Sequence, residues 1–402
     1  IPDGRFPTVP YGAPNPEVSE SMDRAVSLAE RTGADLVFSC DPDADRLGVV
    51  VKTASGWRPL TGNEIALLAT CAALQGPRVS TQSVVMRTEV TCSLVSRLAK
   101  AHGVLVVDHL LVGFKYIGDG IRALEEEGAF AGTHGGPDDF LVGVEESHGL
   151  LVTPGVRDKD AAGGALLLAE LASLEKQKGR TLVDVLEGIW VEHGRVSNVL
   201  LSLVMRGAKG RQQIEAIQSS LRSSPPALIA GRRCVRTTDH QDPEGVHGAI
   251  RSETDRASRN VLSFELEGGA RVIVRPSGTE PKSKVYAELY ANNGESQQDV
   301  EERCRSLARD FVRELLVRVD IHLPAWTQDM SGLLAIEDRL DFAERVLPEL
   351  LDRLGDPEIE VWLDAEMAHY GRDARRLVAS GVRTWVAERS GDFEGLLALF
   401  RV

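Results

Sequence analysis

Short apolar runs alternate with amphipathic stretches through the first half of the chain. The runs "ADLVFSC", "LGVVVKT", "SVVMRT" and "VLVV" have the length and composition of buried strands. Residues 17–33 carry apolar side chains at helical spacing and stop at Gly33, and further helical patterns follow the later runs to about residue 178. Strands that alternate with helices predict an α/β fold, with functional residues in loops at strand ends.

The pattern changes near residue 190. Strand-like segments joined by short turns follow, with helices expected at "GRQQIEAIQSSL" and "DVEERCRSLARDFVRELLVRV", which indicates a smaller α+β domain. The polar stretch "TTDHQDPEGVHGAIRSETDRASRN" is expected to be a solvated loop. Beyond "HLPAW" we expect a helical extension, with helices at about 332–354, 357–371 and 373–389 and a last one near Asp392. We expect this extension to be removable near residue 323, after its Pro-bearing link.

Composition narrows the class of protein. The 402 residues are long enough for two to four domains, and the formal net charge of −14 argues against nucleic acid or an anionic membrane as a partner. No apolar run reaches membrane-spanning length. The five scattered cysteines form no C-x-x-C pair, which favours a cytoplasmic location over a disulfide framework or a zinc site. Because the chain opens at Ile1 without Met, we expect an N-terminal segment to be missing.

The segment "FSCDPDADRL" places Asp41, Asp43 and Asp45 on alternate positions, followed by Arg46. Three carboxylates between two apolar strands can converge on one hard cation, and Mg²⁺ prefers such oxygen ligands. A solvated acidic turn is the alternative. An EF-hand is excluded, because its sixth and twelfth positions would be Arg46 and Lys52 instead of Gly and Glu. A haloacid-dehalogenase-type phosphatase is less favoured, since that family has Thr or Val at the position of Asp45.

A second polar loop follows a later apolar run. "GVEESHG", residues 143–149, places Glu145 and Ser147 where they could bind adjacent sugar hydroxyls, although an acidic helix cap is an equal alternative. Arg157 and Lys159 follow in "VRDKDA" and could hold an anion; a surface salt-bridge cluster is the alternative there.

The third loop, "RPSGTEPKSK", lies between two predicted strands. Arg275 can bind a phosphate with two hydrogen bonds, and the hydroxyls of Ser277 and Thr279 can donate further ones. Gly278 allows backbone N–H groups to approach an anion. An ordinary hairpin turn is the alternative, but the combination favours phosphate binding.

In this order the three loops resemble those of the α-D-phosphohexomutases, the phosphoglucomutase/phosphomannomutase superfamily. "DPDADR" is similar to that family's magnesium loop, "GVEESHG" to its sugar-recognition loop and "RPSGTEPK" to its phosphate loop, with "PNPE" and "LVGFKYIG" also similar. The resemblance covers about residues 1 to 320 and implies the following division: 1–60, the C-terminal part of α/β domain II with the metal loop; 61–190, α/β domain III with the sugar loop; 191–322, α+β domain IV with the phosphate loop; and 323–402, a helical extension without a family counterpart.

The resemblance also implies roles for individual residues. They comprise Mg²⁺ ligation by Asp41, Asp43 and Asp45; catalytic contacts to phosphate by Arg46 and Lys159; sugar recognition by Glu145 and Ser147; substrate contacts by Lys115, Arg157 and His148; and a phosphate grip by Arg275, Ser277, Gly278 and Thr279.

The activity implied is interconversion of hexose 1-phosphate and hexose 6-phosphate, of glucose or mannose, through a phosphoserine and a bisphosphate intermediate. The family nucleophile lies in a "TASHNP"-like loop, and the sequence has no such stretch. We therefore expect this chain alone to bind the phosphosugar without converting it. A phosphopentomutase of the same superfamily and a non-catalytic phosphosugar-binding module are the alternatives.

Overall fold

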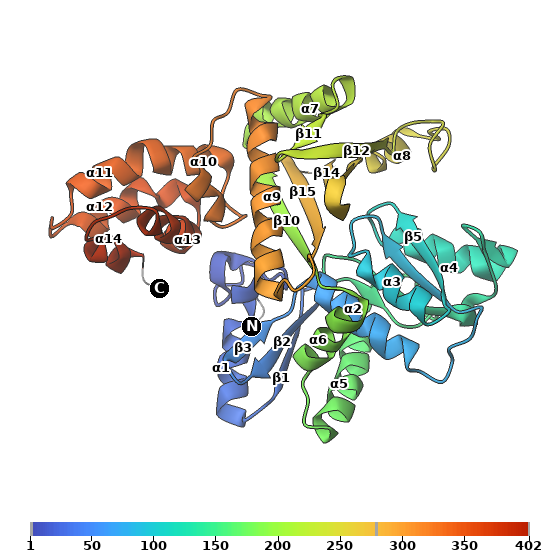
Figure 1. Ribbon diagram of the computed structural model, residues 1–402. Coiled ribbons are helices and arrows are strands. Elements are labelled where there is room, and N and C mark those ends of the chain that lie inside the picture. Colours follow the sequence, from blue (N-terminus) through green and yellow to red (C-terminus); the bar gives the residue numbers. More distant parts are fainter. Residues whose placement is uncertain (1–2, 278–279, 401–402) are drawn as a thin grey trace. The chain divides into compact units, whose positions relative to one another are not determined.

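The computed structural model describes residues 3–277 and 280–400 and forms two compact units, Ile1–Val196 and Ser197–Val402 (Figure 1). Both units combine β-sheet with helices, as the sequence pattern predicted. The finer division into four domains stays a prediction. Within the part of the chain that is described, no helix has both the length and the apolar character needed to cross a membrane.

The first unit begins with a small antiparallel sheet in the order β1-β2-β3. Its elements are α1 (Asp23–Thr32), β1 (Leu36–Cys40), β2 (Leu47–Thr53) and β3 (Gly56–Pro59). The central strand β2 is buried from Leu47 to Val51, whereas only Val37 of β1 is buried. The expectation of a buried first strand was therefore wrong, because β1 is an edge strand of an antiparallel sheet. The turn between β1 and β2 carries the three aspartates.

A second sheet has the order β5-β4-β8-β9, with β4 parallel to β5 and β8 and with β9 antiparallel to β8. Every residue of β4 and β8 is buried, as expected for parallel strands that are covered on both faces. The strands are β4 (Val84–Thr88), β5 (Leu105–Leu110), β8 (Phe140–Val144) and β9 (Leu150–Leu151). The helices are α2 (Gly62–Leu74), α3 (Leu94–Ala101), α4 (Lys115–Glu127), α5 (Ala161–Gln177) and α6 (Leu182–His193), and β6 (Ala129–Phe130) and β7 (Thr133–His134) form a small hairpin.

Polar residues fix where helices of this unit begin. Thr61 accepts a hydrogen bond from the Glu64 N–H while the Glu64 carboxylate accepts one from the Thr61 N–H, so a capping box starts α2. The side chain of Asp160 accepts from the N–H groups of Ala162 and Gly163 and starts α5. These caps set the positions at which the loops end.

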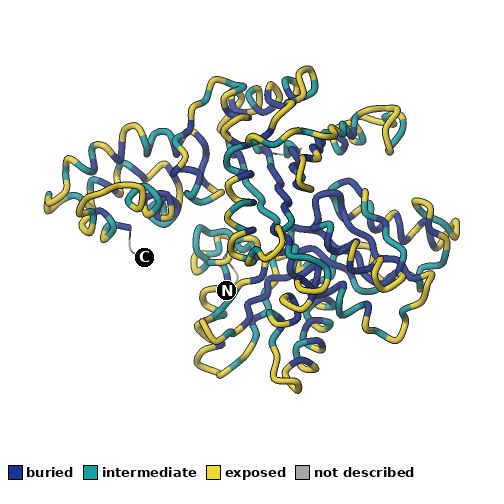
Figure 2. The backbone as a smooth tube through the Cα atoms, in the orientation of Figure 1, coloured by how far each residue is buried: buried dark blue, intermediate teal, exposed yellow. Residues whose placement is uncertain are grey.

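The second unit is built on a sheet in the order β10-β15-β14-β13-β12-β11. Its strands are β10 (Val196–Val204), β11 (Leu228–Ile229), β12 (Arg232–Asp239), β13 (Leu262–Leu266), β14 (Arg271–Pro276) and β15 (Lys282–Tyr290). Helices α7 (Gly207–Ser223) and α9 (Gln297–Val317) pack on it, and Figure 2 shows α9 with one buried and one exposed side. The stretch that was expected to be a solvated loop begins instead within β12, at Thr237, and contains a short helix, α8 (Glu253–Ser258), whose N-terminus is capped by Ser252.

The helical extension follows α9 in the same unit. Its helices are α10 (Ile336–Asp341), a π-helical turn (Phe342–Val346), α11 (Leu347–Asp352), α12 (Ile359–Glu366), α13 (Ala374–Ala387) and α14 (Glu394–Leu399). Leu323 and Ile336 are buried in one hydrophobic cluster with α9 and the sheet. The extension therefore shares a core with the preceding domain, which argues against the expectation that it could be removed near residue 323.

Candidate functional site

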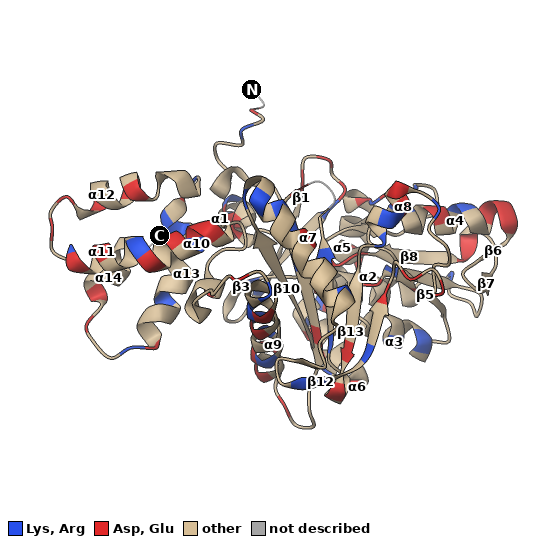
Figure 3. Ribbon diagram, turned by 90° about the horizontal axis from the view of Figure 1, so that it is seen from above, with Lys and Arg blue, Asp and Glu red and all other residues tan. Residues whose placement is uncertain are grey.

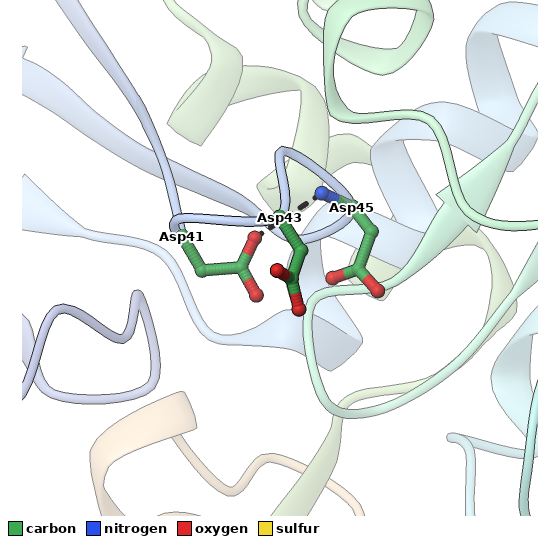
Figure 4. Close-up of side chains that lie close together, drawn as sticks. All are labelled: Asp41, Asp43 and Asp45. Atoms are coloured by element: carbon green, nitrogen blue, oxygen red, sulfur yellow. Dashed lines mark hydrogen bonds between the residues drawn. The ribbon is translucent and has the colours of Figure 1, made fainter.

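The turn between β1 and β2 brings three carboxylates together (Figure 4). One oxygen of Asp41 accepts hydrogen bonds from the backbone N–H groups of Asp45, at 3.1 Å, and Arg46, at 3.3 Å. Ala44 takes a left-handed conformation, with φ of 57°, which closes the turn. One carboxylate oxygen from each of Asp41, Asp43 and Asp45 lies within 4.8 Å of the others. This donor set of three carboxylates suits a hard divalent cation.

Basic side chains offset the repulsion among these carboxylates. Lys159 Nζ lies 2.9 Å from Asp45 Oδ2, while Arg46 Nε lies 3.8 Å from Asp41 Oδ2 and 3.9 Å from Asp45 Oδ1. The other end of the Arg46 guanidinium donates to Glu17 Oε1 at 3.3 Å. Asp45 Oδ1 is buried and, among the described atoms, accepts no hydrogen bond. A buried carboxylate oxygen that accepts no hydrogen bond leaves an acceptor that a cation could use.

Lys159 stays charged in this setting. Burial by itself would lower the pKa of Lys159, but the hydrogen bonds and ion pairs with Asp45 and Asp158 outweigh burial and raise that pKa above its ordinary value. The ammonium group also lies 5.5 Å from the ring centroid of Phe114. The structure thus places a fixed positive charge beside the aspartates.

The second loop joins β8 to β9 and is closed by a hydrogen bond from the Glu145 N–H to the Gly149 carbonyl, at 2.9 Å. Glu145 is 5% exposed, and its Oε1 accepts from the Gly113 N–H at 3.2 Å. Burial, and next the charge of Glu146, raise the pKa of Glu145 to about 7. Ser147 is half-buried beside it. Glu145 lies in a strand-to-strand turn, so it is not a helix cap.

His148 connects the two loops. The Leu47 N–H donates to the His148 carbonyl at 3.0 Å, and His148 Nδ1–H donates to the Leu47 carbonyl at 3.0 Å. Arg46 and Gly149 form an isolated β-bridge next to this pair. His148 is buried, and burial lowers its pKa. The aspartate turn and the Glu145 loop are consequently held as one structure.

Glycine occupies two positions where other groups approach the second loop closely. A Cβ atom at Gly149 would lie 2.4 Å from Lys159 Cδ and 3.0 Å from Glu145 Oε2. A side chain at Gly62, at the start of α2, would lie 2.0 Å from the Glu146 carbonyl oxygen. Both glycines therefore let neighbouring groups approach the Glu145 loop closely.

Two other candidates make contacts of their own. The exposed Arg157 pairs with Glu125 and donates to the Pro154 carbonyl, so it is engaged on the surface. Lys115, the first residue of α4, is exposed, with its ammonium 4.9 Å from the ring centroid of Tyr116.

Residues that the motif reasoning missed lie at the same site. Glu17 pairs with Arg46, and Phe114 contacts the Lys159 ammonium. Their signals were present in the segments "PNPE" and "LVGFKYIG", which had been noted only as similar to family segments.

The third loop lies in the second unit, between β14 and β15. Arg275 at the end of β14 pairs in register with Lys284 on β15, so two basic residues are neighbours at the base of the loop. The Ser277 N–H donates to the Lys282 carbonyl at 2.7 Å, and Ser277 Oγ accepts from the Glu280 N–H at 3.4 Å. Gly278 and Thr279 lie outside the described residues. The described part of the loop thus places two basic residues on neighbouring strands at its base.

Comparison with known proteins identifies the domains. Residues 1–56 match α/β/α domain II of phosphoglucomutase/phosphomannomutase, residues 61–193 match α/β/α domain III, and residues 231–305 match the C-terminal domain. A phosphoglucomutase of Staphylococcus aureus (strain MSSA476) is 34% identical over 295 residues, which cover 73% of this chain and 51% of that protein. One of Staphylococcus haemolyticus is 34% identical over 290 residues, which cover 71% and 51%.

A solved structure agrees at the level of the fold. The exocytosis-sensitive phosphoprotein parafusin, a phosphoglucomutase from Paramecium, shares 18% identity with a TM-score of 0.51, covering 76% of this chain and 50% of that one. The chain thus spans about half the length of the curated relatives it matches. With three consecutive domain matches and these relatives, the chain belongs to the phosphoglucomutase/phosphomannomutase family.

Proposed function

We propose that this chain supplies the metal site and the phosphosugar-binding loops of a phosphohexose mutase. The reaction is the interconversion of hexose 1-phosphate and hexose 6-phosphate, of glucose or mannose, through a phosphoserine and a bisphosphate intermediate. The observation that carries the proposal is the joint structure of the aspartate turn, Lys159 and the Glu145 loop in one unit. The two curated relatives described above are named phosphoglucomutases, which supports the reaction class.

Asp41, Asp43 and Asp45 would hold Mg²⁺, whose charge, when it is bound, offsets the negative charge of the phosphoryl group in transfer. Arg46 and Lys159 keep cationic groups next to the same carboxylates, so they can neutralise a phosphate that approaches the turn. They remain fixed because Glu17, Asp45 and Asp158 bind them.

Glu145 and Ser147 would bind sugar hydroxyls. With a pKa of about 7, the Glu145 carboxyl exists in both protonation states near neutral pH, so it can accept a hydrogen bond from a hydroxyl or donate one to it. His148 keeps this loop attached to β2 and so fixes the position of Glu145 relative to the aspartates.

The loop from Arg275 to Thr279 would bind the phosphate that does not react. Arg275 has no ion pair with any described residue, and Lys284 is its neighbour across the strand pair, so the loop offers positive charge to an anion. We propose in addition that this chain alone binds without turnover, because no segment of the sequence resembles the phosphoserine loop. A cytoplasmic location stays a prediction.

Two assays test the proposal together. Calorimetric titration with glucose 1-phosphate should show binding, and Arg275→Ala should weaken it roughly tenfold or more, since a charged hydrogen bond contributes about 1.5–3 kcal/mol. Arg233→Ala, on the exposed face of β12, is the matched control and should leave the affinity unchanged.

The second assay follows glucose 6-phosphate formation by a coupled enzyme, with the bisphosphate as primer. We expect no turnover by this chain. No binding of glucose 1-phosphate, or binding that is indifferent to Arg275, would refute the phosphosugar site. Clear turnover would refute the proposal that the chain needs a further nucleophile.

A further inference from the structure

The helical extension lies beyond the three matched family domains, the last of which ends at residue 305. It is bound firmly to the domain that precedes it. Asp329 pairs with Arg309 on α9 and also accepts a hydrogen bond from Thr384 Oγ1 on α13, at 2.8 Å. One carboxylate therefore joins the sheet domain to two parts of the extension.

A second junction forms at Arg206, between β10 and α7. Its backbone N–H donates to Glu337 Oε1 at 3.0 Å. Its guanidinium lies 2.6 Å from Asp338 Oδ2 and donates to the His369 carbonyl at 3.2 Å. Glu337 and Asp338 are the second and third residues of α10, whose acidic residues Figure 3 marks. The backbone at Arg206 is thus fixed by the extension.

The residue before Arg206 contacts the phosphate-binding loop. The N–H of the buried Met205 donates to the Pro281 carbonyl at 3.0 Å. Pro281 precedes Lys282, whose carbonyl accepts from the Ser277 N–H and closes the loop. Arg206 has an extended backbone, in which successive N–H groups point in opposite directions. One amide of this pair consequently binds the loop while the next binds the extension.

The part of the extension that holds Arg206 is densely hydrogen-bonded and packed. Arg339, which is 5% exposed, donates to the carbonyls of Thr327, Ser331 and Leu334. Phe342 packs edge-to-face against the rings of Trp326, Tyr370 and Phe400. A buried cation that closes three carbonyls, together with an aromatic core, gives α10 a fixed position.

We propose that the helical extension positions residues 280–282 of the anion-binding loop, through Glu337 and Asp338 on one side of Arg206 and the Met205–Pro281 hydrogen bond on the other. This inference rests on the proposed phosphosugar binding for its effect on affinity. Glu337 and Asp338 are positioning residues that act without touching the ligand. They fix the backbone at Met205 and Arg206, just after β10, and Met205 in turn holds Pro281 in the second half of the loop.

The test uses the full chain with Glu337→Ala, since Glu337 is exposed and its loss should not unfold the protein. The affinity for glucose 1-phosphate, and for inorganic phosphate as a simpler probe, should fall about threefold to tenfold, the range of one hydrogen bond. Amide hydrogen exchange at Met205 and in residues 280–282 should become faster. Glu337→Gln keeps the acceptor oxygen and should restore both readouts, and Glu344→Ala, an exposed acid of the adjoining π turn, is the control.

Two comparisons separate positioning from mere stabilisation. In Glu337→Ala the chain should remain folded under the assay conditions, and the Mn²⁺ affinity of the aspartate turn should stay at its original value. Asp338→Asn, which weakens the ion pair to Arg206, should lower phosphosugar affinity in the same direction.

The outcomes distinguish this inference from the proposed function. Unchanged exchange and unchanged affinity in Glu337→Ala would overturn the inference even if the original chain binds glucose 1-phosphate. If the original chain binds no phosphosugar but exchange at Met205 still rises in the variant, the proposed function fails and the mechanical link stands. If the original chain binds no phosphosugar and exchange at Met205 does not rise in the variant, both the proposed function and this inference are wrong.

Discussion

Glu145 should make the stability of this protein fall as pH rises. Its carboxyl is 5% exposed, and burial, then the charge of Glu146, raise its pKa from 4.5 to about 7. In the unfolded chain the carboxyl loses its proton near 4.5, while in the folded chain it keeps the proton to about 7. The folded state therefore binds more protons between these values, and the free energy of unfolding decreases with pH across that window.

The magnitude follows from the two pKa values. At about 1.4 kcal/mol per pKa unit, the difference corresponds to a loss of about 3 kcal/mol, complete above pH 7. Glu145→Gln removes the ionisation but keeps an oxygen that can accept from the Gly113 N–H. The variant should match the original chain near pH 4.5 and exceed its stability by up to about 3 kcal/mol above pH 7.

The assay is urea denaturation in the presence of a chelator, at steps from about pH 4.5 to 8, with the difference between variant and original chain as the readout. Titrating groups that do not interact with Glu145 contribute equally to both proteins and cancel in this difference, whereas Glu146 and Lys159, which interact with its charge, do not cancel fully. Glu192→Gln, at a 76% exposed side chain in the same unit, is the control and should give a difference near zero at every pH. A flat difference for Glu145→Gln across the window would refute the reasoning from burial.

Two further predictions concern packing. Ile336→Ala should lower the free energy of unfolding of the second unit by about 2–4 kcal/mol in urea denaturation, because Ile336 is buried in the shared core. A chain that ends near residue 323 but unfolds at the same temperature as the original chain would contradict the shared core. Gly62→Ala should lower the free energy of unfolding by several kcal/mol, since its Cβ would lie 2.0 Å from the Glu146 carbonyl oxygen. Gly188→Ala, at a helix position with open space, should raise that free energy by about 0.5–1 kcal/mol. Equal shifts of the melting temperature in the two variants would count against the close approach at Gly62.

The local part of the site could be predicted from the sequence. Aspartates on alternate positions between two apolar strands are carried by one short turn, so their convergence depends on few residues. The capping box of Thr61 and Glu64 is a local pattern of the same kind. The alternation of strands and helices likewise predicted the α/β fold.

Long-range contacts had no such signal. The ion pair of Lys159 with Asp45 and the mutual hydrogen bonds of His148 and Leu47 join segments that are distant in the chain. Arg157 lies two residues before Lys159 in the sequence but pairs with Glu125. Local spacing could not predict this pairing either, because it depends on how α4 packs. The extension was expected to be separable because a Pro-bearing link precedes it, but burial of Ile336 across that link is a property of tertiary packing.

Binding of Mn²⁺ to the purified chain, measured by electron paramagnetic resonance, tests the central claim that the aspartate turn is a divalent-metal site. The account predicts one site of weak to moderate affinity, competed by Mg²⁺ and weakened in Asp43→Asn, because Asp43 supplies one of the three convergent oxygens. Asp119→Asn, an exposed acid on α4, should bind as the original chain does. No Mn²⁺ or Mg²⁺ binding by the well-folded chain, or equal affinity in Asp43→Asn, would contradict the claim.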